Sequence, residues 1–170
     1  MKISIVFRNI FKRKGIDAKT IARVLCDYAT REKYINNYLQ KFEPIRGTTH
    51  IDLGTLRNFL LVYRIFIVDY ICFLTFSKDK RNEIADAFNT YIFAFFITDE
   101  PNNIEEEVYH QQFDAYKQIV NSSSGGEIPK NLGDKFSDLI GNYDPMIALL
   151  ATSVFMQDAT TLKEVLKDYS

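Results

Sequence analysis

Apolar residues recur at intervals of three and four along almost the whole chain of 170 residues, and sustained alternation of apolar and polar residues is nearly absent. Intervals of three and four place side chains on one face of an α-helix, whereas alternation is typical of a strand. The sequence therefore predicts an all-α fold, a single-domain bundle of six or seven helices over residues 1–170. Because 14% of the residues are aromatic, we expect a core rich in rings.

The stretch from Leu61 to Phe76 defines the expected centre of this bundle. It reads LVYRIFIVDYICFLTF and lies within a predicted helix near residues 55–77. A helix that is apolar nearly all round lies in the middle of a protein or in a membrane. Two charges within the stretch would each oppose membrane insertion by about 2.5–3.5 kcal/mol, and no second apolar segment of about 20 residues is present. We therefore expect a central core helix.

Arg64 and Asp69 are the two charged residues in this stretch. Apolar residues lie three and four positions from Asp69 on both sides, so its carboxylate is either buried or placed at a gap in the packing. An ionised carboxylate in an apolar interior needs a partner. We expect Asp69 to meet a cation or hydroxyl of another helix, and Arg64 either to mark an exposed edge or to pair with Glu32. These three residues are the candidate buried polar groups.

The other helices are predicted from the same spacing, interrupted by glycine, proline and polar clusters. A connection is expected at residues 44–54, and the NSSSGGE sequence predicts a flexible loop at residues 121–128. The remaining expected helices cover residues 2–13, 17–42, 79–97, 103–120, 129–140 and 145 onward, and the last of these is expected to bend into a short final helix at residues 162–168.

Capping residues mark several of these ends. Asp17 and Asp144 are expected to cap the helices that follow them, because a carboxylate accepts hydrogen bonds from free backbone N–H groups. Gly141 is expected to stop the helix before it. Thr161 and Glu164 have the spacing of a capping box, which predicts a separate last helix.

Charge and cysteine content limit which partners the protein is expected to bind and in which cell compartment it is expected. The net charge of -1 provides no long-range field to attract nucleic acid, so nucleic acid is not expected as a partner. Cys26 and Cys72 have no cysteine or histidine nearby at metal-ligand spacing and are expected to be reduced thiols. Reduced thiols, together with the lack of a recognisable secretory signal, predict a cytoplasmic protein.

Glu107 and His110 are the weak candidates for a metal site, because a Glu and a His three residues apart can share an ion on one helix face. A di-iron bundle needs this motif twice, and His50 has no Glu three residues before it. The alternative is that the glutamates near Glu107 complement the dipole at a helix start. No metal or cofactor is expected, and no catalytic residue can be assigned.

Residues 1–14 form a basic amphipathic segment that is expected to be helical. A helix of this composition binds an anionic membrane surface or docks on a protein partner, unless its apolar side packs on its own domain. The interface candidates are Ile3, Phe7, Ile10, Phe11, Lys12 and Arg13.

No nucleophile motif, glycine-rich phosphate loop or set of convergent histidines is recognisable in the sequence. The sequence therefore predicts a non-enzymatic interaction or regulatory module that binds a protein partner or itself as a homo-oligomer. One alternative is a peripheral membrane protein that uses the N-terminal helix. The other is a small helical enzyme or ligand binder with a polar pocket near Arg64 and Asp69.

Overall fold

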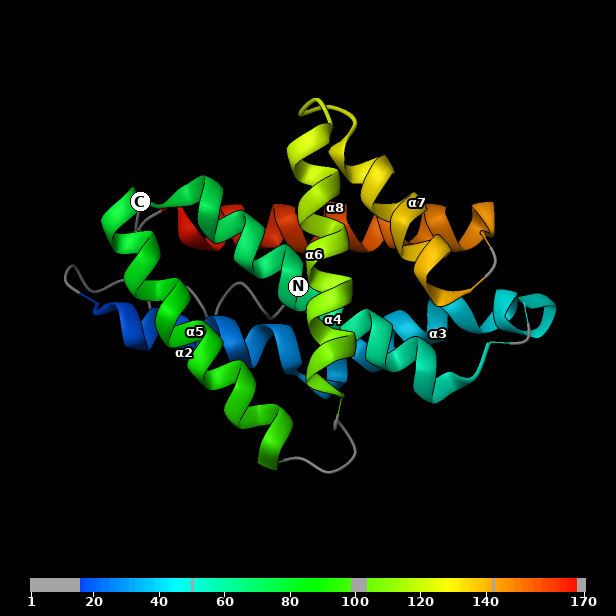
Figure 1. The fold of residues 1–170 in the computed structure, drawn as a ribbon, viewed down its shortest axis with the longest axis horizontal. Helices are drawn as coiled ribbons and strands as arrows, with labels where there is room; N and C mark the ends of the chain where they lie inside the picture. Colours follow the sequence, from blue (N-terminus) through cyan, green and yellow to red (C-terminus); the bar gives the residue numbers. More distant parts are fainter. Residues whose placement is uncertain (1–15, 50, 99–103, 142, 168–170) are drawn as a thin grey trace. The chain divides into compact units, whose positions relative to one another are not determined.

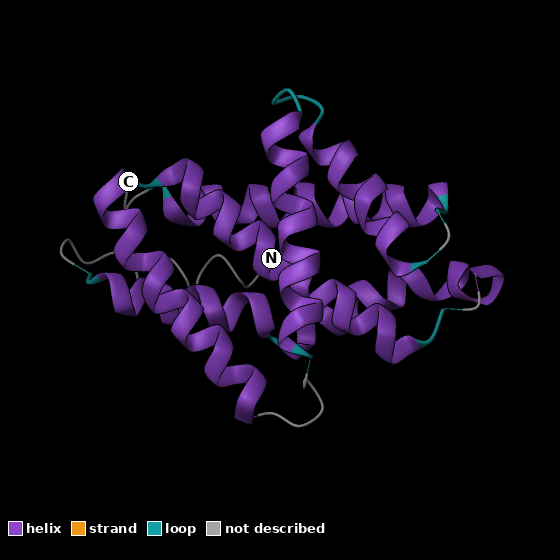
Figure 2. Cartoon of the chain, in the orientation of Figure 1, coloured by secondary structure: helices purple, strands orange, loops and turns teal. Residues whose placement is uncertain are grey.

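The computed structural model describes residues 16–49, 51–98, 104–141 and 143–167, and these residues form helices and short connections without a strand (Figures 1 and 2). The predicted all-α fold is confirmed. The helices are α2 (Ala18–Thr30), α3 (Glu32–Thr49), α4 (Leu53–Thr75), α5 (Lys78–Thr98), α6 (Glu106–Ser122), α7 (Ile128–Ile140) and α8 (Pro145–Leu166). The interface candidates of residues 1–14 lie outside the described residues.

The chain divides into two compact units, and each is described by itself. Unit 1 contains α2 up to Ala29, α5, the end of α4 from Ile67 and the end of α8 from Asp158. Unit 2 contains α3, α6, α7, the part of α4 up to Phe66 and the part of α8 up to Gln157. The organisation of the chain as a single domain stays a prediction.

Helix α4 is the apolar helix that the sequence predicts near residues 55–77. Every residue from Leu60 to Val68 is buried. Among the described residues, α4 is the one helix long and apolar enough to cross a membrane, a test that the core helix of a globular protein also passes. Since 61% of its most apolar window is buried inside the protein, α4 fits the expected core helix.

Aromatic rings form much of the core of unit 2. The ring of Tyr63 on α4 lies 5.1 Å from that of Tyr116 on α6 and 5.0 Å from that of Phe136 on α7, measured between centroids. One turn further along α4, Phe66 lies 5.3 Å from both Phe113 and Tyr116. Such pairs add about 0.5–1.5 kcal/mol each beyond the area they bury. The rings therefore join α4, α6 and α7 within this unit.

In unit 1, the core combines apolar faces with one buried hydrogen bond. Ile84, Phe88 and Ile92 are buried on α5 at the predicted spacing of four. Tyr28 on α2 donates a hydrogen bond of 2.7 Å to Oδ1 of Asp158 on α8, and both side chains are buried.

The predicted helix over residues 17–42 is divided at Arg31, which belongs to neither α2 nor α3. The carbonyl oxygen of Arg31 accepts hydrogen bonds from the backbone N–H groups of Tyr34 at 2.9 Å and Ile35 at 3.3 Å. Arg31 thus acts as the capping residue that opens a new helix. Helix α3 then continues past Pro44, where we expected a connection, because a helix can include proline at the loss of one backbone hydrogen bond.

The predicted separate last helix is wrong, because α8 runs without interruption to Leu166. Leu162 and Leu166 are buried, so they continue the buried side of α8 at helical spacing, and this burial outweighs the local capping pattern of Thr161 and Glu164. The stop at Gly141 is confirmed by its positive φ of 150°, a conformation that favours glycine.

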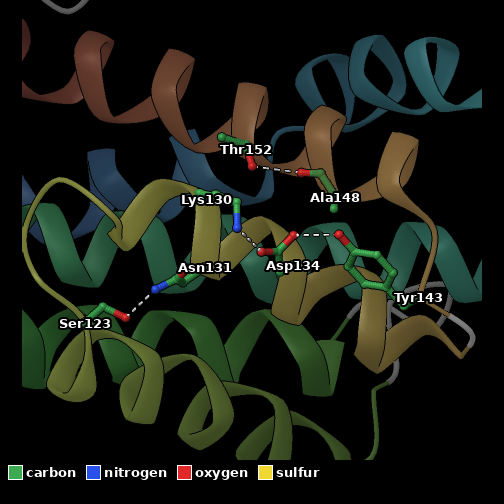
Figure 3. Close-up of polar contacts among 7 residues, drawn as sticks. All are labelled: Ser123, Lys130, Asn131, Asp134, Tyr143, Ala148 and Thr152. Carbon is green, nitrogen blue, oxygen red and sulfur yellow. Dashed lines mark hydrogen bonds and ion pairs between the residues drawn. The ribbon is translucent and has the colours of Figure 1, made fainter.

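The predicted loop at residues 121–128 corresponds to the connection between α6 and α7. Its ends carry hydrogen bonds, from Asn131 Nδ2 to Ser123 Oγ at 2.9 Å (Figure 3) and from Ser124 Oγ to Glu127 Oε2 at 2.7 Å. The flexibility of this loop stays a prediction.

Candidate functional site

Helix α8 carries large apolar side chains on its exposed side. Met146, Leu149 and Met156 are 52%, 61% and 52% exposed, and Ser153 is exposed between them. The intervals of three, four and three residues place these four side chains in one row, the spacing at which helices pair in coiled coils. We call this row the α8 face. The sequence from Pro145 to Gln157 contains no charged residue.

The opposite side of α8 fixes the direction in which this face points. Ile147, Ala151, Val154 and Phe155 are buried at 5% exposure or less. Burying one Val, Ile or Phe side chain contributes about 1.5–3 kcal/mol. A rotation of α8 that covered the α8 face would expose these residues instead, so the row stays exposed in unit 2.

The start of α8 is held by the predicted cap. Oδ1 of Asp144 accepts hydrogen bonds from the backbone N–H groups of Met146 at 2.7 Å and Ile147 at 3.2 Å. The buried hydroxyl of Ser137 on α7 donates to the carbonyl oxygen of Asp144 at 2.9 Å and accepts from its N–H at 2.7 Å. These bonds connect the first turn of α8 to α7.

Helices α7 and α8 also meet where α7 has a glycine. A Cβ atom added at Gly133 would overlap Oγ1 of Thr152 and the carbonyl oxygen of Ala148. The Thr152 hydroxyl is itself held by a hydrogen bond of 2.8 Å to the Ala148 carbonyl (Figure 3). The missing side chain lets the two backbones approach closely. This close contact holds the buried side of α8 against α7.

Tyr143, two residues before α8, is 53% exposed and is positioned by α7. Its hydroxyl donates to Oδ1 of Asp134 at 3.1 Å, and Lys130 Nζ lies 3.1 Å from Oδ2 of the same carboxylate (Figure 3). The hydrogen bond to Asp134 raises the pKa of the Tyr143 phenol and that of the Lys130 amine. Tyr143 therefore remains neutral and adds exposed aromatic surface just before the α8 face in the chain.

Arg64, one of the predicted buried polar groups, is fully buried. Its guanidinium carbon lies 5.4 Å from the ring centroid of Tyr34 and 5.6 Å from that of Tyr38, both on α3. The alternative that Arg64 marks an exposed edge of α4 is therefore wrong. Cation–π contacts of this kind stabilise a guanidinium that has been removed from water.

Glu32 is exposed rather than buried, and it forms an ion pair with Arg57. The expected pairing of Glu32 with Arg64 is replaced by this contact two turns earlier on α4. The physical reason is that Glu32 begins α3 on the surface, where its carboxylate keeps its hydration.

Asp69 is half-buried in unit 1, which fits the alternative of a carboxylate at a gap in the packing rather than that of a fully buried one. Burial raises the pKa of the neighbouring Cys72 thiol, and the charge of Asp69 raises it further. Among the described residues of this unit, Asp158 has an enclosed carboxylate and is 2% exposed. Sequence reasoning missed it, although Asp158 lies at helical spacing from the apolar residues Phe155 and Leu162. A pocket shared by Arg64 and Asp69 stays a prediction.

Glu107 and His110 lie on the exposed surface of α6. Glu107 Oε1 accepts a hydrogen bond of 3.1 Å from Gln111 Nε2, and His110 Nε2 lies 3.6 Å from Oε1 of Glu106. Within the part of the chain that the structure describes, no group of three or more His, Cys, Asp or Glu side chains could hold a metal ion.

The α8 face thus remains as the candidate site, and sequence reasoning did not single it out. A signal was present in the thirteen uncharged residues of PMIALLATSVFMQ, but periodicity alone does not tell which apolar row of a helix is covered. Comparisons of the chain with protein-family models, with curated proteins and with solved structures find no match.

Proposed function

We propose that this protein is a non-enzymatic interaction module that associates with a second copy of itself through the α8 face. The observation that supports this function is the row of three large apolar side chains, each more than half exposed, on a helix whose other side is buried. Single exposed apolar residues are normal on a protein surface, whereas a contiguous group marks an interaction site.

The absence of charge on this part of α8 favours a second copy as the partner. A twofold interface places the same surface of two subunits together, so a charge close to the twofold axis meets its own copy. Like charges in contact destabilise an interface, and residues 145–157 contain none.

The order of side chains along the α8 face suits an antiparallel pair. Ser153 lies near the middle, with Leu149 four residues before it and Met156 three residues after it. When two α8 helices cross at Ser153, Leu149 comes opposite Met156 of the partner subunit. The small serine permits a close approach of the backbones, and the flexible methionines adapt to the opposing surface.

Sedimentation equilibrium of the full chain over a range of concentrations tests the proposal. We expect a mass that rises toward twice the 19.8 kDa of the chain. The double variant Leu149→Lys, Met156→Lys should remain monomeric, because it places ammonium groups on both sides of the proposed twofold axis.

A matched control uses the same substitutions on an exposed apolar pair of unit 1. Phe73 and Leu74 are 55% and 51% exposed, so Phe73→Lys, Leu74→Lys changes the total charge equally. The control variant should still associate. A monomeric wild-type chain at all concentrations, or equal association by both double variants, would overturn the proposal.

A further inference from the structure

Two polar oxygen atoms in the core of unit 2 have no hydrogen-bond partner among the residues that the structure describes. They are Oε1 of Gln112 and the hydroxyl oxygen of Tyr116. Tyr116 is fully buried and Gln112 is 4% exposed. Most buried polar atoms in folded proteins are paired with protein groups or bound water, so each exception requires a physical explanation.

The two side chains are neighbours on α6. Residues four apart lie on the same side of a helix, one turn from each other. Gln112 and Tyr116 share the buried side of α6 with Tyr109 and Phe113. One bound group between them could therefore satisfy both oxygen atoms.

The Tyr116 hydroxyl is not exposed to solvent. Its ring is packed 5.1 Å from the ring of Tyr63 and 5.3 Å from that of Phe66, measured between centroids. Burial also raises the pKa of the phenol, so Tyr116 is neutral and can donate a proton. The missing partner must therefore lie inside the protein.

We propose that Gln112 and Tyr116 bind one neutral hydroxyl group between them, that of an internal water or of a small alcohol. A hydroxyl both donates and accepts, so it can donate to the Gln112 carbonyl oxygen and accept from Tyr116. It can also serve the opposite orientation of the Gln112 amide. A charged ligand does not fit, because neither residue offers the opposite charge that a buried ion requires.

The bound hydroxyl has a structural consequence for the aromatic core. The side of α6 that carries Phe113 and Tyr116 packs against Phe66 of α4. A group that bridges Gln112 and Tyr116 stiffens this side of α6 and fixes the direction of the Tyr116 ring. This site is independent of the α8 face and of self-association.

A double-mutant cycle of Tyr116→Phe and Gln112→Met tests the site, because both substitutions nearly preserve side-chain volume. If a hydroxyl bridges the two residues, each single variant lowers Tm, and the double variant lowers it by less than the sum of the two. If the oxygens have no partner, removing either one relieves an unpaired buried group. Unchanged or raised Tm in both single variants would therefore overturn the proposal.

Two measurements on the folded wild-type chain identify the hydroxyl. Native mass spectrometry should show added mass if it belongs to a small alcohol. Without added mass, NMR should show magnetisation transfer from a long-lived water to the Gln112 amide protons, and this transfer should disappear in Tyr116→Phe. If native mass spectrometry shows no added mass and NMR shows no transfer from water, the proposal is overturned, even if the variants are too unstable to compare.

Discussion

The hydroxyl of Tyr28 donates a hydrogen bond of 2.7 Å to Oδ1 of Asp158, although the two residues are 130 positions apart in the chain. The bond joins α2 to the end of α8 within unit 1, and both side chains are buried. A buried carboxylate needs donors of this kind because it has lost its hydration. Asp158 is therefore a core carboxylate bound to a hydroxyl of another helix.

Tyr28→Phe should lower the free energy of unfolding by about 1.5–3 kcal/mol, the usual contribution of a hydrogen bond to a charged group. The ring and its packing remain, so the change isolates the loss of the hydroxyl. Urea unfolding measures the effect. An unchanged stability would show that this bond contributes little to unit 1.

Gly133→Ala should destabilise the protein by about 1–3 kcal/mol, the usual cost of overpacking a core. The new methyl group would overlap Thr152 and the backbone of Ala148, and backbone cannot move aside easily. Gly126→Ala is the control, because an added Cβ there meets no atom within 4 Å. The control should change the stability by less than about 0.5 kcal/mol. Equal effects of the two substitutions would contradict the close contact of α7 and α8.

Arg64→Lys should destabilise the protein by about 2 kcal/mol or more, because an ammonium group is more strongly hydrated and loses more on burial than the guanidinium that lies over the rings of Tyr34 and Tyr38. Arg57→Lys is the matched control two turns earlier on the same helix. The side chains of Arg57 and Glu32 are 17% and 55% exposed, and surface ion pairs contribute about 0–1 kcal/mol. The two denaturation curves should therefore differ clearly, and similar curves would exclude a stabilising role for the cation–π contacts of Arg64.

The helix caps and the different contacts of Arg57 and Arg64 show which features of the structure could be predicted from the sequence. Asp17 and Asp144 cap their helices as expected, because a cap depends on groups only two or three residues away. The apolar spacing likewise predicted α4. Partners across helices depend on how the helices pack, so the expected pairing of Glu32 with Arg64 was wrong. The α8 face was missed for the same reason, since exposure is a property of the packed fold.

The helix caps Asp17 and Asp52 also predict that the stability of the fold depends on pH in the acid range. Backbone N–H groups of Thr20 and Thr55 donate to the carboxylates of Asp17 at 2.7 Å and Asp52 at 2.9 Å. These bonds lower the pKa of each aspartate below its ordinary value of 3.8. The ionised caps therefore stabilise the fold above pH 3.8, and their contribution is lost as the pH falls through the lowered pKa.

Asp17→Asn, Asp52→Asn tests this dependence, because asparagine can cap a helix without titrating. The variant should lose less stability than the wild type between pH 5 and about pH 2.5 in urea unfolding. Parallel losses would show that the two carboxylates do not contribute to acid sensitivity. Asp79→Asn is a suitable control, since Asp79 lies within the first turn of α5 rather than at its cap.

The thiol of Cys72 should be unreactive in the folded protein. It is 5% exposed, and burial together with the nearby charge of Asp69 raises its pKa, so little of the nucleophilic thiolate is present at pH 8. In a Cys26→Ala variant, which leaves Cys72 as the one remaining cysteine, reaction with an aromatic disulfide should be at least about a hundred-fold slower in buffer than in urea.

Adding Asp69→Asn to this variant removes the local negative charge and leaves the side-chain size almost unchanged. If the folded rate rises with this second change while the rate in urea stays constant, the carboxylate acts on the thiol through its charge. Fast labelling of folded Cys26→Ala would instead mean that the end of α4 opens readily to solvent.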